Sequence, residues 1–420
     1  MIIETAHDGD LFSPGKFSRF HLDEKSDINA VRRFDSDSGT DLDLFDFRLN
    51  FVGFVTDEKD DMLAVFPKNF SIHNVSSDAK LVFQTIARYS QRRHTDFIGQ
   101  LSDEKWETSF PFAAFFSIYS YYQKHGLFFE TKEVLRNNAG GKINWKETIR
   151  QSDKYISHDK LVFYPFLYKK TKNVFSFLTQ CMIFSIDYTA IKFGELLDVQ
   201  PIEYEMPNFD IYGHKEAIVN ELLRIREATF RDDYLKLIDA LIAFFGKINY
   251  GGRYYLKHYT FSSIWEDSTR RYLSRHFNGI IDDTIQLSPS PKASVKFEKK
   301  SFNPNEAVNN EYFQPDCYVE SGDTQFIFDA KYYSNSRGIM YKELAYVLLL
   351  KDVRDFVESK PKFAKTSCAV ILPSTERKTF VNFKMNPTFN SYYANIKIME
   401  EYFDIRDVLI DYLDGNSLTD

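Results

Sequence analysis

The chain contains few cysteines, and they show no pairing pattern. Cys181, Cys317 and Cys368 lack the close spacing of a zinc site or of a disulfide framework, and they fit a reducing cytoplasm. Glycine and proline are also scarce, with 17 and 13 residues among 420, which argues against a disordered chain. We therefore expect a folded cytoplasmic protein.

Signals for secretion or membrane insertion are missing as well. The first ten residues, MIIETAHDGD, contain no basic region followed by an apolar core. Apolar runs such as residues 112–118 are short and interrupted by polar residues, so none is long enough to span a membrane. The sequence predicts a soluble protein without a membrane partner.

A phosphate-binding loop is absent too. Residues 140–142 read Gly-Gly-Lys, but the first glycine of the motif G-x-x-x-x-G-K-[ST] is missing, and Ile143 stands where serine or threonine is needed. The chain therefore has no evident nucleotide-driven motor, and any nucleotide hydrolysis would come from a partner.

The composition that is present indicates several well-packed domains. Hydrophobic residues make up 43% of the chain and aromatic residues 17%, which is enough to bury real cores. A length of 420 residues exceeds the usual size of one domain, so two or three domains are expected. The formal net charge of −7 does not decide for or against nucleic acid, because affinity depends on local charge near the phosphates.

The pattern along the chain predicts a multidomain α/β (α+β) protein in four parts. Residues 1–75 are expected to form a β-rich module, and residues 76–210 a helical, winged-helix-like module that contacts DNA or a partner. Residues 211–252 are expected to be linking helices. Residues 253–420, after the break at Gly251 and Gly252, are expected to carry the chemistry.

Two basic segments have two interpretations each. The first contains Trp145 and could reach DNA or a partner, or be an exposed wing with ordinary charges; its basic residues are Lys142, Lys146 and Arg150. The second, residues 287–310, is either a strand with a solvated face or an edge that contacts DNA; its basic residues are Lys292, Lys296, Lys299 and Lys300.

Residues 314–331, QPDCYVESGDTQFIFDAK, are the most informative stretch. A turn signal at residues 322–323 separates two strand-like segments, so residues 316–320 and 325–331 are predicted to pair as a hairpin. Side chains alternate along a strand, which places Asp329 and Lys331 on one face, while Asp316 enters from the neighbouring strand. Two carboxylates and an ammonium group are therefore expected to converge.

Such a cluster suits phosphodiester hydrolysis, because Mg²⁺ takes carboxylate oxygens, retains waters and bridges to phosphate oxygens. A solvated Asp-x-Lys ion pair is the alternative. The apolar run at residues 326–328 marks a buried strand, however, and buried charges at its end require a reason.

The flanking segments place further elements around the hairpin. Residues 261–276 are predicted to form an amphipathic helix carrying Glu266, which is either an additional acidic ligand or a surface glutamate. Residues 339–350 are predicted to form a helix packed on the sheet. Residues 368–372 are predicted to form a buried strand that stops at Pro373.

The pattern Pro315-Asp316, a gap of 12 residues and then Asp329-Ala330-Lys331 resembles the PD-(D/E)xK nuclease superfamily. The resemblance implies a restriction-endonuclease-like αβββαβ core. It also implies that Asp316 and Asp329 bind Mg²⁺, with Mn²⁺ as a substitute, and that Ala330 lends its backbone carbonyl. Glu266 would complete the acidic set, and Lys331 would orient the attacking water or neutralise charge in the transition state.

The phrases DAKYY and MYKELAY resemble the nuclease subunits of McrBC-type and LlaJI-type restriction systems, over about residues 261–375. In those subunits the second helix begins with Tyr-Gln before Leu-Ala-Tyr, whereas this chain has Lys342 and Glu343 there. The resemblance implies a DNA endonuclease that cuts double-stranded DNA in antiviral defence. It also implies a GTP-hydrolysing AAA+ partner of the McrB type and an oligomeric assembly.

Two alternatives remain at this stage. The same core serves in transposition or repair nucleases, and a neighbouring gene for a GTPase or for a transposase would distinguish them from restriction. The chain could also be a non-catalytic DNA-binding or assembly subunit with a silent core. The intact Asp316, Asp329 and Lys331 argue against a silent core.

Overall fold

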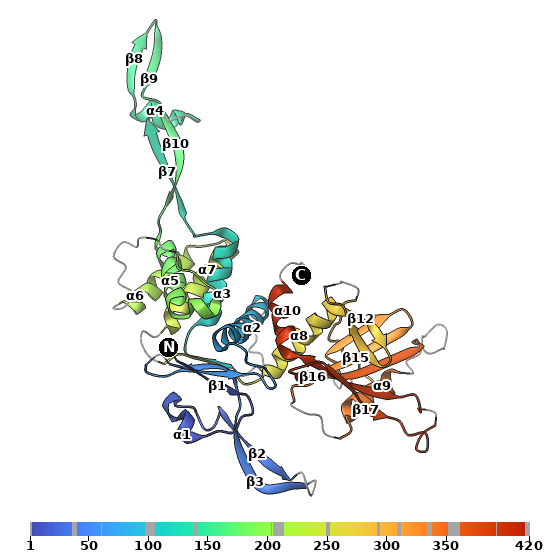
Figure 1. The fold of residues 1–420 in the computed structure, drawn as a ribbon. Helices are drawn as coiled ribbons and strands as arrows, with labels where there is room; N and C mark the ends of the chain where they lie inside the picture. Colours follow the sequence, from blue (N-terminus) through green and yellow to red (C-terminus); the bar gives the residue numbers. More distant parts are fainter. Residues whose placement is uncertain are drawn as a thin grey trace. The chain divides into compact units, whose positions relative to one another are not determined.

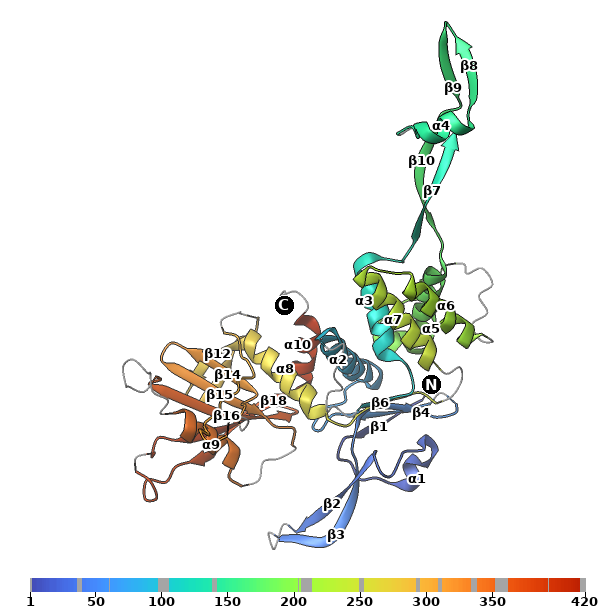
Figure 2. The same ribbon diagram turned by 180° about the vertical axis from the view of Figure 1, so that it is seen from behind.

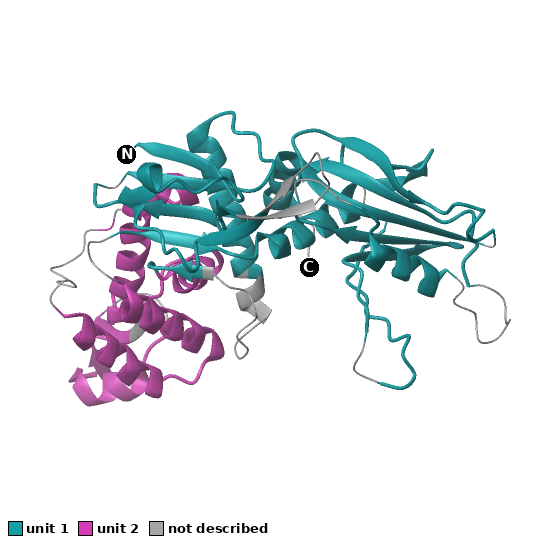
Figure 3. Ribbon diagram, turned by 90° about the horizontal axis from the view of Figure 1, so that it is seen from below, with its two compact units in different colours: residues 1–110, 251–420 teal, residues 111–250 magenta. Residues whose placement is uncertain are grey.

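A computed structural model of the protein describes residues 2–35, 40–59, 61–96, 106–137, 142–202, 204, 214–248, 253–291, 295–308, 312–333, 338–351, 362–391 and 393–415. The chain forms two compact units, Met1–Phe110 with Gly251–Asp420, and Pro111–Tyr250 (Figure 3). The four-part division expected from the sequence stays a prediction, because a compact unit can contain more than one domain. Among the described residues, no helix is both long and apolar enough to cross a membrane.

The first unit contains a five-stranded sheet built mainly from the N-terminal part of the chain (Figure 1). Its order is β1 (Ile3–His7), β5 (Met62–Phe66), β4 (Val52–Thr56), β11 (Tyr255–His258) and β6 (Trp106–Thr108). Only β1 and β5 pair in parallel. The apolar runs of β4 and β5 are buried throughout, and α2 (Val75–Asp96) packs against this sheet.

Strand β11 joins distant parts of the chain, since it lies between β4 and β6. The close approach depends on Gly53, whose φ is +145° and where an added Cβ would lie 1.9 Å from the carbonyl oxygen of Leu256. Beside this sheet lie four short elements: α1 (Pro14–Phe17), η1 (Ser18–Phe20) and the hairpin of β2 (Ile28–Asp35) and β3 (Thr40–Leu49). The β-rich N-terminal part is therefore completed by a strand that follows residue 252.

The second sheet of this unit has the order β14 (Cys317–Ser321), β15 (Thr324–Ala330), β16 (Lys365–Ser374), β18 (Lys397–Asp404) and β17 (Lys378–Lys384). Strands β15, β16 and β18 run parallel, while β14 and β17 are antiparallel edges. The hairpin of β12 (Phe277–Ile281) and β13 (Thr284–Leu287) precedes them. The predicted pairing of residues 316–320 with 325–331 is confirmed within one residue at each end.

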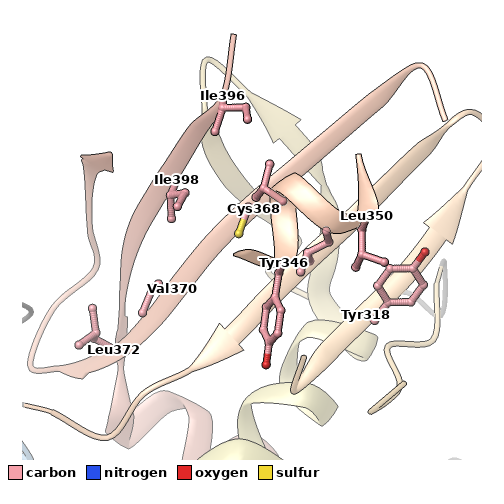
Figure 4. Close-up of a cluster of buried hydrophobic side chains, with 10 residues drawn as sticks. Tyr318, Tyr346, Leu350, Cys368, Val370, Leu372, Ile396 and Ile398 are labelled. Atoms are coloured by element: carbon pink, nitrogen blue, oxygen red, sulfur yellow. The ribbon is translucent and has the colours of Figure 1, made fainter. Parts of the chain in front are cut away.

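Helices cover this second sheet, and the alternation of β15 separates its two faces. Ile327 belongs to a cluster with Tyr346 and Leu350 of α9 (Tyr341–Leu350), which Figure 4 shows together with residues of β16 and β18. Phe326 and Phe328 instead contact Phe277, which follows α8 (Phe261–His276) directly. Helix α10 (Ile405–Asp414) follows β18 directly. Between α8 and α9 the chain forms β12, β13, β14 and β15, of which β14 and β15 belong to this sheet, and β16 follows α9. The α/β multidomain fold class is confirmed.

The prediction that Pro373 stops its strand is wrong, because β16 continues to Ser374. Pairing of β16 with β15 ends at Ile371, so beyond that residue only the β18 side is paired. A proline, which has no N–H group to donate, is tolerated where one side of the strand is open. The carbonyl of Pro373 accepts a hydrogen bond from the Asn69 side chain at 2.9 Å.

The second unit combines a group of helices with a β-stranded extension (Figure 2). The helices are α3 (Phe112–His125), α5 (Phe177–Leu197), α6 (Lys215–Glu227) and α7 (Asp232–Lys247), and α7 contacts the other three. Strands β7 (Glu130–Asn137) and β10 (Leu167–Val174) form an antiparallel ribbon. The short helix α4 (Trp145–Gln151) and the hairpin of β8 (Asp153–Ser157) and β9 (Lys160–Tyr164) lie between them in the chain.

Candidate active site

Three of the four predicted catalytic residues, Asp316, Asp329 and Lys331, lie where β14 begins and β15 ends, at the carboxyl end of the parallel strands. Asp329 is on the same face of β15 as Ile327, so it points toward α9, and it is 1% exposed. Asp316, just before β14, is 5% exposed, and its Oδ2 accepts a hydrogen bond from the Ala330 backbone N–H at 3.1 Å. The hairpin thus brings the two aspartates together, as expected.

Lys331 follows β15 directly and is held between two acidic side chains. Its Nζ forms a short ion pair with Asp329 and lies 3.3 Å from Oε1 of Glu343 on α9. Two hydrogen bonds anchor the chain, one at this lysine and one at the residue that follows it. The N–H of Lys331 donates to the Ile371 carbonyl at 2.9 Å, and the hydroxyl of the next residue, Tyr332, accepts from the Lys68 N–H at 2.8 Å.

The sequence left open a substrate-facing polar role for Lys342 and Glu343 without counting them as catalytic, and the structure places Glu343 in the site. Its side chain is 2% exposed, although a glutamate is rarely buried without a partner. The signal that could have found it is the departure from the family pattern at residues 342–343. Lys342 also reaches the site, with its Nζ 3.6 Å from Oδ1 of Asp329, but its side chain is 53% exposed.

Glu266 on α8 is connected to the site through a lysine. Nζ of Lys299 lies 3.0 Å from Oε2 of Glu266 and 3.2 Å from Oδ1 of Asp316. Lys299 belongs to the basic segment 287–310, whose sequence left open whether it contacts DNA. The structure therefore joins Glu266 and Asp316 indirectly and adds an ammonium group that was not expected in the site.

The pKa values of the site residues depend on their burial and on the lysines that lie between the carboxylates. Burial, together with the nearby Asp329 and Glu266, raises the pKa of Asp316 to about 7, although Lys299 opposes the shift. Burial, with Asp329 nearby, also raises the pKa of Glu343 against the effect of Lys331. Although burial opposes the charge of Lys331, Asp329 and Glu343 hold its pKa above the usual range. Lys331 is therefore protonated at neutral pH.

The residues fit a hard divalent cation. Both carboxylate oxygens of Asp329 face ammonium groups: Oδ2 forms the ion pair with Lys331, and Oδ1 lies 3.6 Å from Nζ of Lys342. Such buried oxygens are suitable metal ligands, and Asp316 supplies a second carboxylate close by. Across the described residues no three acidic, histidine or cysteine side chains form a ready-made metal cluster. The assignment of Glu266 and of the Ala330 carbonyl as ligands stays a prediction.

Comparison with known proteins identifies the family. A family model described as "LlaJI restriction endonuclease" matches residues 51–383. A solved structure of the McrBC complex from Thermococcus gammatolerans is similar at 13% identity, covering 63% of this chain and 84% of that chain, with a TM-score of 0.24, too low to support an argument. No curated protein matches the chain. Because the family match spans well over half of the sequence and includes the site, the chain belongs to the LlaJI restriction endonuclease family.

Proposed function

We propose that this chain is the DNA-cleaving subunit of a restriction system and that it hydrolyses phosphodiester bonds of double-stranded DNA with Mg²⁺. The observation that carries the proposal is the arrangement of the buried Asp316 and Asp329 with Lys331 at the end of β15. An ion pair with Lys331 needs one buried carboxylate, whereas two buried carboxylates close together suit a divalent cation.

Asp316 and Asp329 would hold the cation, with Glu266 and the Ala330 carbonyl as further oxygen ligands. When bound, Mg²⁺ would polarise the scissile phosphate and acidify a coordinated water. Lys331 is protonated, so it would act by donating hydrogen bonds rather than by accepting a proton. Its ammonium group would orient the attacking water or stabilise the negative charge that develops on the phosphate.

We infer that the chain works with a GTP-hydrolysing AAA+ partner, as its resemblance to McrBC-type and LlaJI-type nuclease subunits implies. Nucleotide hydrolysis would come from that partner, because the sequence has no phosphate-binding loop. The β8–β9 hairpin supports a protein contact in the second unit. Tyr155, Ile156 and Leu161 are 52%, 82% and 57% exposed, and a two-stranded hairpin has no core of its own to bury them. Cutting both strands of a duplex would further need two active sites, and hence an oligomeric assembly. We expect this assembly to act in the cytoplasm.

The test is cleavage of plasmid DNA with Mg²⁺, by the protein alone and with the product of the neighbouring gene plus GTP. Asp329→Ala and Lys331→Ala should abolish cutting. Asp323→Ala, in the exposed turn of the same hairpin, is the matched control and should cut normally. Cutting that needs metal and both side chains, and that rises with the partner and GTP, would support the proposal. Metal-dependent cutting that ignores partner and nucleotide would indicate a stand-alone nuclease instead.

A further inference from the structure

The ammonium group of Lys299 contacts two carboxylates that are also proposed metal ligands. This group lies 3.0 Å from Glu266 and 3.2 Å from Asp316, and these two carboxylates come from α8 and from the start of β14. Lys299 is the residue in the described part of the site that bridges Glu266 and Asp316. In the proposed function, both carboxylates bind the divalent cation.

An ammonium group and a divalent cation compete for the same carboxylates. Both are attracted to Glu266 and Asp316, and at hydrogen-bond distance from a shared oxygen they repel each other strongly, because the surroundings are partly buried. A metal ion entering between these side chains would therefore displace the lysine.

The structure shows how Lys299 can leave without disturbing the fold. The neighbouring Glu298 is fixed to β14 by two backbone hydrogen bonds with Tyr318, at 2.8 and 2.9 Å. The Lys299 side chain is 40% exposed and flexible, so its ammonium group can move while the backbone stays in place. Once displaced, the ammonium group would pair with another anion. A phosphate of DNA bound at the same site is an anion of the right kind.

Lys300 provides an internal contrast. Its Nζ lies 2.9 Å from Oε1 of Glu320 and 4.8 Å from the centre of the Tyr318 ring, on the other side of the same short segment. Adjacent lysines of similar exposure, 40% and 37%, thus have different partners: one faces the site and one faces away.

We propose that Lys299 is an exchangeable internal cation, which neutralises Glu266 and Asp316 in the metal-free protein and moves to a DNA phosphate when the metal binds. This inference rests on the proposed function, because it requires a metal at these carboxylates. The exchange of Lys299 makes metal binding and DNA binding cooperative. Bound DNA lowers the free-energy cost for the metal to displace the ammonium group, and bound metal does the same for DNA. By linkage, DNA must raise metal affinity by the same factor as the metal raises DNA affinity.

The test is calorimetric titration of the full-length chain with Ca²⁺, an oxygen-seeking cation, with and without a short DNA duplex. Removing the competing charge in Lys299→Met should tighten Ca²⁺ binding about tenfold without DNA and reduce the factor by which DNA tightens Ca²⁺ binding. Lys300→Met is the matched control and should behave like the wild type. Lys299→Gln repeats the test with a polar side chain if the methionine variant does not fold.

Unchanged or weaker Ca²⁺ binding by both Lys299 variants, with the effect of DNA retained, would overturn the inference while leaving the metal site intact. A different failure would be the absence of Ca²⁺ binding in the wild type and in every variant, with or without DNA. That result would remove the metal site itself, and with it both the proposed function and this inference.

Discussion

At the scale of single residues, Asp329 and Glu343 can be buried near each other because Lys331 lies between them. Removing Lys331 should leave two buried carboxylates without their shared cation, since Lys342 contacts Asp329 from an exposed position. Lys331→Ala should therefore lower the free energy of unfolding by about 3 kcal/mol. Glu343→Gln added to it should recover part of the loss, because the pKa of Glu343 is already raised by burial and by Asp329.

Urea denaturation of the wild type, both single variants and the double variant measures this coupling. Glu343→Gln alone should leave stability nearly unchanged, because it removes a costly buried charge while Lys331 keeps Asp329. A double variant less stable than Lys331→Ala would contradict the arrangement, since it would mean that Glu343 stabilises the fold independently of Lys331.

His258 of β11 predicts how stability depends on pH. Its ring is buried, its Nδ1 has no hydrogen-bond partner within the described residues, and burial lowers its pKa from 6.5 to about 4. Between pH 4 and pH 6.5, His258 is therefore protonated to a greater extent in the unfolded chain than in the folded one. The stabilisation is fully present above about pH 6.5 and is lost as the pH falls toward 4.

At pH 5 this group alone should reduce the free energy of unfolding by about 2 kcal/mol relative to pH 7. His258→Phe should remove that contribution, because an aromatic ring fits between Tyr89 and Phe261, whose rings contact His258 at present. Denaturation curves for both proteins at pH 7 and pH 5 give the difference. An equal loss of stability in the two proteins would show that other groups control the acid response.

At the scale of elements, the pairing of β11 with β4 carries the connection into α8 and so positions Glu266. Gly53→Ala would place a methyl group 1.9 Å from the Leu256 carbonyl and would also strain a backbone with φ of +145°. We expect a loss of about 3 kcal/mol or more in unfolding free energy. Gly246→Ala in α7 is the control, since its added methyl group meets nothing within 4 Å and alanine favours the helix. Thermal unfolding of the two variants should separate them clearly, and similar melting temperatures would refute the packing argument.

Elements also show how far the sequence can predict this protein. Alternation and turn residues locate β14 and β15, and with them Asp316, Asp329 and Lys331, because these relations are local along the chain. Lys299 and Glu343 meet this group only when separate segments fold against the hairpin, so spacing cannot reveal them. The same limit hides the position of β11, which pairs with strands far away in the sequence.

At the scale of the whole molecule, the second unit is inserted between neighbouring strands of one sheet. Residues 111–250 follow β6 and precede β11, and these two strands pair antiparallel, with Thr108 opposite Leu256. The Ser109 N–H donates to the Tyr255 carbonyl at 3.2 Å, so the chain leaves and re-enters the first unit at adjacent points. An insertion with adjacent ends can be removed without breaking the host sheet.

Replacing residues 111–250 by a short Gly-Ser linker should therefore give a folded first unit with a single cooperative unfolding transition. It should still bind Ca²⁺, because Asp316, Asp329 and Glu266 all belong to that unit. It should lose any stimulation of cleavage by the partner and GTP, since the exposed β8–β9 hairpin is gone. A matched deletion of residues 153–164 alone should lose the same stimulation while keeping the four helices. Retained stimulation in both deletions would place the partner contact on the first unit, and loss of folding in the large deletion would show that the sheet depends on the insertion.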